Sequence, residues 1–402
     1  MHHRQSRRGA VLRWTALLLV ATVFTGGTVH ATQPVAWPAN PSTLCDAVDD
    51  LVFNGTRANE SVQWQVSLGP RLPGSDASEA FRAHLTSVLE PMGYEVTETV
   101  HHRHGMNLTN FEARWPSTTV NASQLVLSAH YDSRNIADHD TNASNRTLPV
   151  PGANDGASGA AVLFELAHVI PQMTFEHDIV LFWNDGEDQN DNFTVGAEAW
   201  AENLTDKDIE RTEAFILLDM VGDADLQLRN INPGNDTLKS RVVELGGALG
   251  LVADRQACDG ELGDDIVQYE VEVGVLDDHY HAHVRNIPSL DIMDPQYGEA
   301  KAMTFGSYWH TMEDTPEKVS ATSLEHVGRL VELGLRTDAF VSVAENPSPT
   351  DERATAPEHD GKVDGDRSAE EDDDTSGIAL LAGVALGAVC ALLAVVEWKG
   401  KP

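Results

Sequence analysis

Short apolar runs that end directly in carboxylate or histidine side chains are the feature that most limits how this chain can fold. Apolar runs at 125–128, 178–183, 214–218 and 289–292 have the length and composition of buried strands. Segments with helical periodicity alternate with them at 159–169, 196–203, 238–249 and 323–337. This order predicts one α/β domain with a mixed, mostly parallel central sheet that is flanked by helices.

The predicted domain spans residues 45–344, because no composition break, internal repeat or low-complexity segment interrupts that range. Residues 345–376 follow, and they are rich in Pro, Asp, Glu and Gly. Like charges repel one another along such a segment, so we expect an extended acidic linker.

Both ends of the chain resemble targeting segments. Residues 1–31 combine a basic start, an apolar stretch and a small-residue ending, which is typical of a signal peptide. Residues 377–396 form an uncharged apolar run long enough to cross a bilayer, and no folded partner follows that would bury a core helix. Lysines at 399 and 401 make residues 397–402 a cytoplasmic tail, so we expect a single-pass cell-membrane protein with its large domain outside.

The charge balance excludes one class of partner. Among 402 residues, 63 are acidic and 27 basic, for a formal net charge of −36. Such a chain lacks the cations that neutralise phosphates, so no nucleic acid is expected to bind, and a solvated acidic surface explains most of the charge. Cys45 and Cys258 could pair or stay reduced, since Cys390 lies in the apolar run. Nine Asn-x-Ser/Thr sequons are compatible with a glycoprotein.

The polar residues that follow the predicted strands point to a metal. Ligands bind at the carboxyl ends of strands in parallel sheets, which is where these residues occur. Buried carboxylates that converge need a cation, and no segment supplies a matching set of Lys or Arg. Two histidines with three aspartates suit zinc. The candidate residues are His130, Asp132, Asp155, Asp185, Glu187, Asp188, Asp219 and His310.

The order of these residues closely resembles the superfamily of M28 zinc aminopeptidases and glutaminyl cyclases, from about residue 69 to 335. The motifs that carry the resemblance are GPRLPGSDASEAF, SAHYDS, PGANDGASGAAVLFELA, LFWNDGED, LLDMVGD, DDH and YWHTMEDT. The resemblance implies a zinc enzyme, with one or two ions, that acts on the N-termini of peptides or proteins. It places one metal position between His130, Asp155 and Asp219, and the other between Asp155, Asp188 and His310.

The resemblance also implies roles for residues that do not bind the metal. Asp132 matches the carboxylate that orients the ligand histidine, and Glu187 falls on the general acid/base. Successive side chains of extended backbone point to opposite sides, so Asp188 can bind metal while Glu187 faces the substrate. Asp185 is expected to be structural, turning the chain at Gly186.

Two reactions use this machinery. In an aminopeptidase, Glu187 would take a proton from the water that attacks the first peptide bond. In a glutaminyl cyclase, the substrate α-amine attacks its own γ-amide carbon, and Glu187 would pass the amine proton to departing ammonia. Cyclisation also needs apolar walls that keep water away.

The aromatic positions favour the cyclase. Phe193, Phe305 and Trp309 match aromatic pocket positions of that branch, although core packing would also explain them. Asp277, in DDH, matches the cyclase carboxylate that holds the general base. Other positions favour a peptidase: animal cyclases have Glu where Asp188 stands and His where Asp291 stands.

Two further histidine clusters occur in the sequence, outside the predicted metal positions. HHRH at 101–104 precedes MNLTNFEARW, which resembles the early hairpin of the family, so HHRH is expected to be an exposed loop rather than a metal site. DDHYHAH at 277–283 should begin a short helix and, apart from Asp277, serve surface and packing roles. A catalytically inactive binding ectodomain is the third hypothesis, and the intact Glu187 and five ligands argue against it.

Overall fold

The computed structural model describes residue 37 and residues 41–343. The predicted signal peptide, acidic linker, transmembrane segment and cytoplasmic tail all lie outside the described residues. In chain order, the elements are α1 (Pro41–Val48), α2 (Gly55–Ser67), α3 (Asp76–Met92), β1 (Glu95–Arg103), β2 (Met106–Trp115), β3 (Gln124–His130), α4 (Ala157–Val169), β4 (Asp178–Asn184), β5 (Asp188–Gln189), β6 (Asn192–Phe193), α5 (Val195–Asn203), α6 (Asp206–Arg211), β7 (Thr212–Asp219), β8 (Leu228–Asn232), α7 (Asp236–Ala248), β9 (Val267–Gly274), α8 (His279–Val284), β10 (Ser289–Met293) and α9 (Ala321–Arg336), with 3-10 turns at Ile170–Gln172 and Pro316–Lys318.

A six-stranded sheet organises the domain, with strand order β1-β2-β4-β3-β7-β10. Strands β4, β3, β7 and β10 are parallel to one another, whereas β1 and β2 form an antiparallel hairpin on the β4 edge. The prediction of a mixed, mostly parallel sheet in one α/β domain is confirmed. The two remaining sheets are small, β5 with β6 and β8 with β9.

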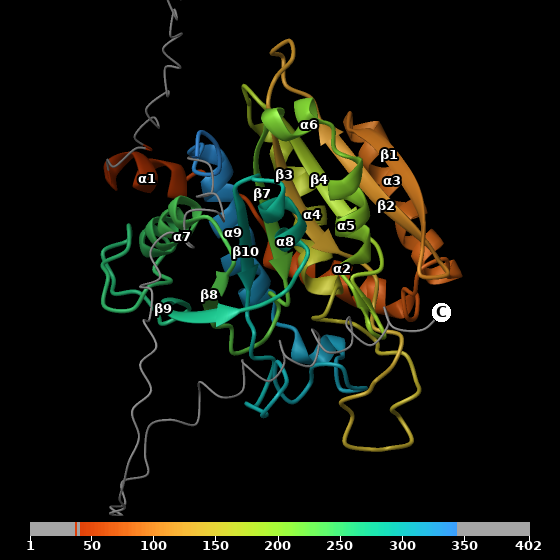
Figure 1. Cartoon of the computed structure of the whole chain (residues 1–402). Coiled ribbons are helices and arrows are strands. Elements are labelled where there is room, and N and C mark those ends of the chain that lie inside the picture. The colour runs from red at the N-terminus through yellow and green to blue at the C-terminus, as the bar shows by residue number, and fades with distance from the viewer. Residues whose placement is uncertain (1–36, 38–40, 344–402) are drawn as a thin grey trace, which may run out of the picture. The chain divides into compact units, whose positions relative to one another are not determined.

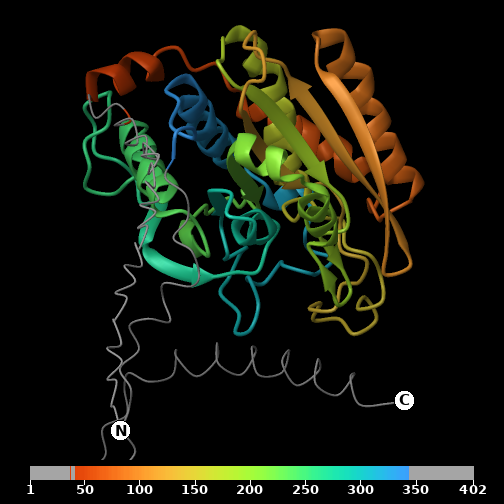
Figure 2. The ribbon, with the colours of Figure 1, turned by 45° about the horizontal axis from the view of Figure 1, so that its top comes forward.

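Helices cover both faces of the sheet (Figures 1 and 2). Along β3, Leu125 and Leu127 belong to the larger core with α2, α4 and α9, while Val126 belongs to a second core with α5 and α8. The same alternation occurs in β4, where Leu181 and Phe182 face opposite cores. Burial on both faces is the physical reason that these strands read as continuous apolar runs in the sequence.

The hairpin corrects one expectation about the histidine-rich segment. Residues 101–103 end strand β1 rather than lying in a loop, and His101 is buried. Only His104 and Gly105 form the turn that leads into β2, and both have positive φ. Within the described part of the chain, this segment is not among the groups of residues that could hold a metal.

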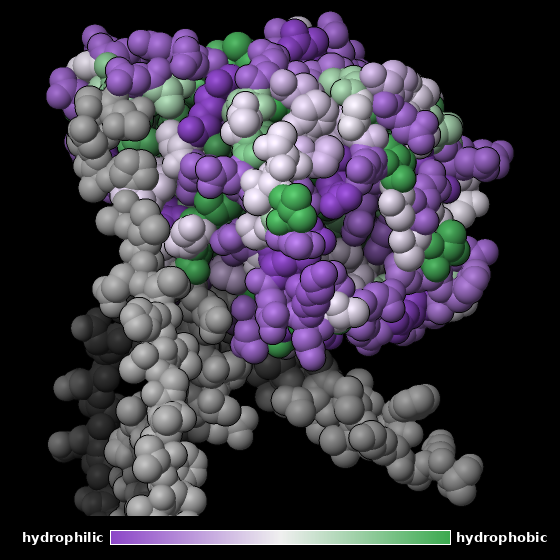
Figure 3. All heavy atoms as spheres, turned by 90° about the horizontal axis from the view of Figure 1, so that it is seen from above, coloured by the Kyte–Doolittle hydropathy of each residue, from purple (hydrophilic) through white to green (hydrophobic). Residues whose placement is uncertain are grey.

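Two further features concern the surroundings of the core. A disulfide joins Cys45 in α1 to Cys258, which follows α7 and lies 213 residues further along the chain. Among the helices of residues 41–343, none is both long and apolar enough to cross a membrane. The face shown in Figure 3 is mostly hydrophilic with scattered apolar side chains, as the excess of acidic residues leads one to expect.

Candidate metal centre

The predicted ligands come together at the carboxyl ends of the parallel strands. His130 is the last residue of β3, and Asp219 is the last residue of β7. Asp188 begins the short strand β5 just after β4, while Asp155 lies in the turn before α4. His310 comes from the loop after β10 and has a left-handed backbone, with φ of 55°.

A glycine permits the close approach of two of these loops. Gly156 has φ of +101°, and a Cβ there would lie 2.5 Å from the carbonyl oxygen of Asp132 and 2.8 Å from Cε1 of His130. Any side chain would therefore push the turn that carries Asp155 away from His130. This packing explains why the Asn-Asp-Gly sequence precedes α4.

Five side chains form two groups that share one member. His130 Nε2 lies 3.2 Å from Asp155 Oδ1 and 3.2 Å from Asp219 Oδ1. His310 Nε2 lies 2.9 Å from Asp188 Oδ2 and 3.6 Å from Asp155 Oδ2. In each group the candidate ligand atoms all lie within 4.8 Å of one another, and all five residues are buried. Asp155 therefore offers one oxygen to each group, as a bridging carboxylate does.

The electrostatics of this cluster fit a divalent cation. Burial raises the pKa of Asp155, and the nearby Asp188 and Asp219 raise it further against the opposing effect of His130. Burial lowers the pKa of His130, but hydrogen bonds with carboxylates bring it well above its ordinary value. Asp188 Oδ2 is buried and makes no hydrogen bond to any described residue. A cation between the groups would neutralise these carboxylates and take up that free oxygen.

Asp132 holds the segment that follows β4. Its oxygens accept hydrogen bonds from the backbone N–H of Glu187 at 3.0 Å and of Asp188 at 3.2 Å. They also accept one from the side-chain amide of Gln189 at 2.9 Å, and Oδ1 lies 3.5 Å from Nδ1 of His130. One carboxylate thus fixes the histidine and the Glu187-Asp188 pair together.

Asp185 has the structural role that we expected. Its carboxylate accepts a hydrogen bond of 2.8 Å from the backbone N–H of Thr109 in β2, and Gly186 follows with φ of +76°. Burial raises the pKa of Asp185 to about 8, with a further contribution from Asp132.

Glu187 lies beside the ligands without belonging to either group. Its side chain is 12% exposed, and Oε2 is 3.9 Å from Nδ1 of His130. Burial raises the pKa of Glu187 well above its ordinary value. His130 opposes that rise, while the carboxylates Asp188, Asp277 and Asp278 add to it. Such a group can hold a proton next to the ligands.

Asp277 belongs to a buried cluster that the sequence did not reveal. Asp277, His279 and Asp291 place their ligand-type atoms within 4.8 Å of one another. Asp278 and His279 are fully buried, so of the expected surface and packing roles only packing fits these two residues. His279 donates from Nε2 to the carbonyl of Pro233 at 2.8 Å, and burial lowers its pKa to about 3.

Three further residues support the ligands and were missed from the sequence. Asp314 accepts hydrogen bonds from the backbone N–H of Asn154 at 2.8 Å and of Asp155 at 3.3 Å. Arg134 is 4% exposed and forms ion pairs with Asp138 and Asp188. Asp138 in turn lies 3.5 Å from Nδ1 of His310. Asp314 is part of the YWHTMEDT motif. Nothing in the neighbouring sequence, however, distinguishes Asp314, Arg134 and Asp138 from ordinary polar residues of a loop.

Two of the predicted aromatic residues contact each other beside His310, and the third, Phe193, pairs with Asp188 across strands β5 and β6. Phe305 and Trp309 contact each other edge to face at 5.0 Å, and the Trp309 ring stacks on that of His310 at 3.4 Å. Both also pack against a small buried core, which is the packing role that we considered for them beside a site role. Phe193 is 43% exposed, and its ring lies 5.3 Å from the guanidinium carbon of Arg134.

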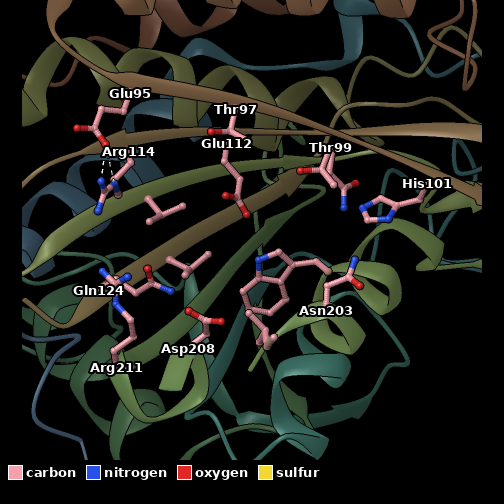
Figure 4. Close-up of a pocket in the computed structure, with 15 residues that line it drawn as sticks. Glu95, Thr97, Thr99, His101, Glu112, Arg114, Gln124, Asn203, Asp208 and Arg211 are labelled. Atoms are coloured by element: carbon pink, nitrogen blue, oxygen red, sulfur yellow. Dashed lines mark hydrogen bonds and ion pairs between the residues drawn. The ribbon is translucent and has the colours of Figure 1, made fainter. Parts of the chain in front are cut away.

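A separate cavity of about 500 Å³ lies between the β1–β2 hairpin and helices α5 and α6 (Figure 4). Val126, Val180 and Trp200 contribute its apolar lining, and none of the predicted ligands takes part. Its two arginines are already paired, Arg114 with Glu95 and Asp178, and Arg211 with Asp178. The cavity is therefore distinct from the metal centre.

The fold and the site together define a class: α/β proteins that gather histidine and carboxylate ligands for a metal at the carboxyl ends of parallel strands. The family follows from the sequence match. The chain belongs to peptidase family M28, whose family model matches residues 110–333.

Known relatives include both cyclases and peptidases. Aminopeptidase YwaD of Bacillus subtilis is 24% identical over 217 residues, which cover 54% of this chain and 41% of that protein. This chain therefore matches about two fifths of that relative. The structure of Porphyromonas gingivalis glutaminyl cyclase is similar with a TM-score of 0.61 and 27% identity, covering 71% of this chain and 99% of that one. The structure of a Zn-dependent exopeptidase from Parabacteroides distasonis is similar with a TM-score of 0.60 and 28% identity, covering 72% of this chain and 99% of that one.

Proposed function

We propose that this protein is a zinc-dependent enzyme that acts on peptide N-termini, converting N-terminal glutamine to pyroglutamate with release of ammonia. The observation that carries the proposal is the pair of buried ligand groups sharing Asp155, with the exposed edge of Glu187 beside them. The structural similarity to a glutaminyl cyclase and to a Zn-dependent exopeptidase supports it.

Zinc fits the donor set that the chain presents. His130, Asp155 and Asp219 would hold one ion, and Asp155, Asp188 and His310 the other, because nitrogen and oxygen donors in this ratio suit zinc. When bound, zinc supplies polarisation of the carbonyl oxygen under attack.

Glu187 would move the proton in the cyclisation. The α-amine nitrogen of the substrate attacks its γ-amide carbon, forming the ring bond, and the bond from that carbon to the amide nitrogen breaks. Glu187 takes a proton from the amine and gives it to the departing nitrogen, which leaves as ammonia. Asp277 raises the pKa of Glu187, and we infer that it keeps the proton available for the second transfer.

The aromatic residues favour cyclisation over hydrolysis. Trp309 stacks on the ligand His310, and Phe305 packs against Trp309. Phe193 lies across from Asp188 in the β5–β6 pair, with its ring 5.3 Å from the guanidinium carbon of Arg134. Such walls would exclude water and keep the glutamine side chain folded back toward its own amine.

Aminopeptidase activity is the alternative. The complete five-ligand set suits a two-zinc peptidase, and the curated relative from Bacillus subtilis is an aminopeptidase. In that reaction Glu187 would take the proton of the attacking water. A catalytically inactive binding ectodomain is less consistent with a complete ligand set beside an acid/base.

We also propose that the enzyme works outside the cell, held to the membrane by residues 377–396. The apolar run and the basic tail in the sequence support this location. Surface labelling of intact cells that express the protein would test it, and labelling that requires cell lysis would contradict it.

One assay separates the two reactions. The purified protein is incubated with a peptide that begins with Gln and, separately, with Leu-p-nitroanilide, after its zinc content has been measured. Loss of the mass of ammonia without shortening of the peptide is the expected result. Release of nitroaniline would instead establish the aminopeptidase, and absence of bound zinc would refute both forms of the proposal.

A further inference from the structure

Arg134 occupies a position between two residues of the second ligand group. It comes from the loop after β3, and its side chain is 4% exposed. Its Nη1 donates to Asp188 Oδ1 and, at 3.2 Å, to the carbonyl of Asn190. Nε and Nη2 donate to the two oxygens of Asp138, each at 2.9 Å. The planar guanidinium thus joins two carboxylates in fixed directions.

The two oxygens of Asp188 have different surroundings. Oδ1 is taken by Arg134, whereas Oδ2 lies 2.9 Å from Nε2 of His310 and makes no hydrogen bond to any described residue. Oδ2 is therefore the oxygen with no hydrogen bond to compete with a metal, whereas the guanidinium already occupies one side of Oδ1. A zinc ion bound through both oxygens would have to share Oδ1 with the guanidinium and would weaken their bond.

The same arginine acts on the histidine of this group through Asp138. Asp138 Oδ1, which accepts from Nε of Arg134, lies 3.5 Å from Nδ1 of His310. A carboxylate on the far nitrogen of a ligand histidine fixes the ring orientation and its tautomer. Arg134 therefore bonds to Asp188 directly and, through Asp138, places a carboxylate beside His310, the third member of this group.

The ring of Phe193 lies 5.3 Å from the guanidinium carbon of Arg134, within the range of a cation–π contact. The Arg134 side chain is 4% exposed, so solvent screens its ion pairs less than those of a surface arginine.

We propose that Arg134 is a positioning residue that limits Asp188 to a single metal-binding oxygen, Oδ2, and so leaves a coordination position open for the substrate. The inference rests on the proposed function, because it concerns a metal at the group of Asp155, Asp188 and His310. An Asp188 that bound through both oxygens would fill that position with the protein's own atom.

The most direct test is a crystal structure of the zinc-loaded wild-type protein. We expect Asp188 Oδ2 at the usual zinc–oxygen distance of about 2.0–2.2 Å, and Oδ1 still bonded to Arg134. A structure in which Oδ1 also binds the ion would overturn the inference. A structure with no zinc at this group after loading would refute the proposed function itself.

A spectroscopic test asks whether Arg134 is the cause. Cobalt(II) is bound to proteins that carry Asp219→Asn, so that only the group with Asp188 is complete. Four-coordinate cobalt absorbs visible light more strongly than five- or six-coordinate cobalt. With Arg134→Met we expect the visible absorption to fall at least twofold, because Asp188 can then use both oxygens.

Two variants serve as comparisons for the cobalt experiment. Arg146→Met, in the same loop and exposed, should leave the spectrum unchanged. Arg134→Lys keeps a cation for one carboxylate and should retain more of the absorption than Arg134→Met. An Arg134→Met protein that binds cobalt with the absorption of its parent would overturn the inference. If Arg134→Met fails to fold, the wild-type crystal structure still tests the single-oxygen binding of Asp188. Arg134→Lys, whose absorption should fall below that of its parent, then tests the role of Arg134, and unchanged absorption would overturn it.

Discussion

Replacement of Glu187 by Gln should separate proton transfer from metal binding. The two side chains have nearly the same shape, so the change removes the charge and the proton acceptor with little repacking. General acid/base residues contribute about 10²- to 10⁴-fold to rate, so we expect turnover to fall by that factor, or about 3–5 kcal/mol in the activation barrier. Glu187 is outside both ligand groups, so the zinc content should not change.

The surroundings of Glu187 also predict the effect on stability. Burial and the carboxylates Asp188, Asp277 and Asp278 raise its pKa, so its charged form is unfavourable in the folded protein without metal. A folded-state pKa above the unfolded value makes stability fall as pH rises through the interval between the two. Because glutamine does not titrate, the Glu187→Gln protein does not lose stability in this way as pH rises. In a metal chelator at pH 8, Glu187→Gln should therefore unfold at the same temperature as the wild type or higher.

The assay combines three measurements on each protein: turnover on the Gln peptide and on Leu-p-nitroanilide, zinc by elemental analysis, and thermal unfolding in chelator. Glu202→Gln on helix α5 is the matched control, because Glu202 is exposed and lies outside the centre. Turnover above one tenth of the wild-type value would refute the assigned role of Glu187. Loss of zinc in the variant would show instead that Glu187 helps to hold the ion.

Three more outcomes follow from single contacts. Asp314→Ala removes the acceptor for the backbone N–H groups of Asn154 and Asp155, and zinc affinity measured by chelator competition should fall about 10- to 100-fold; unchanged affinity would contradict this support. Burial raises the pKa of Asp185 to about 8, so the folded protein keeps a proton that the unfolded chain has released between about pH 4 and 8. Its contribution to stability is then complete below about pH 4 and is lost as pH rises, by at most about 1.4 kcal/mol per pH unit. Urea unfolding of metal-free Asp185→Asn should accordingly show a flatter pH profile than the wild type, and parallel profiles would count against the shift. Cys45→Ser opens the bond to Cys258 and should lower the free energy of unfolding by about 2–5 kcal/mol, whereas an unchanged denaturation midpoint would show that the bond contributes little.

The main elements could be predicted from the sequence because their signals are local. Strands such as β3 and β4 are buried on both faces, which produces uninterrupted apolar runs that any reader of the chain can find. His130 and Asp219 could also be predicted, because they stand at the ends of such apolar runs. Burial of a polar side chain there costs free energy unless a partner or a metal compensates it. Gly156 likewise marks its turn by residue type alone.

Contacts between distant loops could not be predicted in that way. Asp314 meets Asn154 from 160 residues away, and Arg134 meets Asp188 from 54 residues away. Each of these residues would be unremarkable on an exposed loop, and only the path of the loops brings them under the ligands. The pairing of Cys45 with Cys258 was open for the same reason.

The sequence by itself determined the α/β layering, the strand ends that carry the site and the residue types that suit zinc, because each depends on neighbours within a few positions. Only the tertiary structure decided which oxygen of Asp188 bonds to Arg134 and which carboxylate lies beside His310. It also decided that Asp278 and His279 are buried. Those features depend on contacts between side chains from separate loops, and such contacts leave no pattern in neighbouring sequence positions.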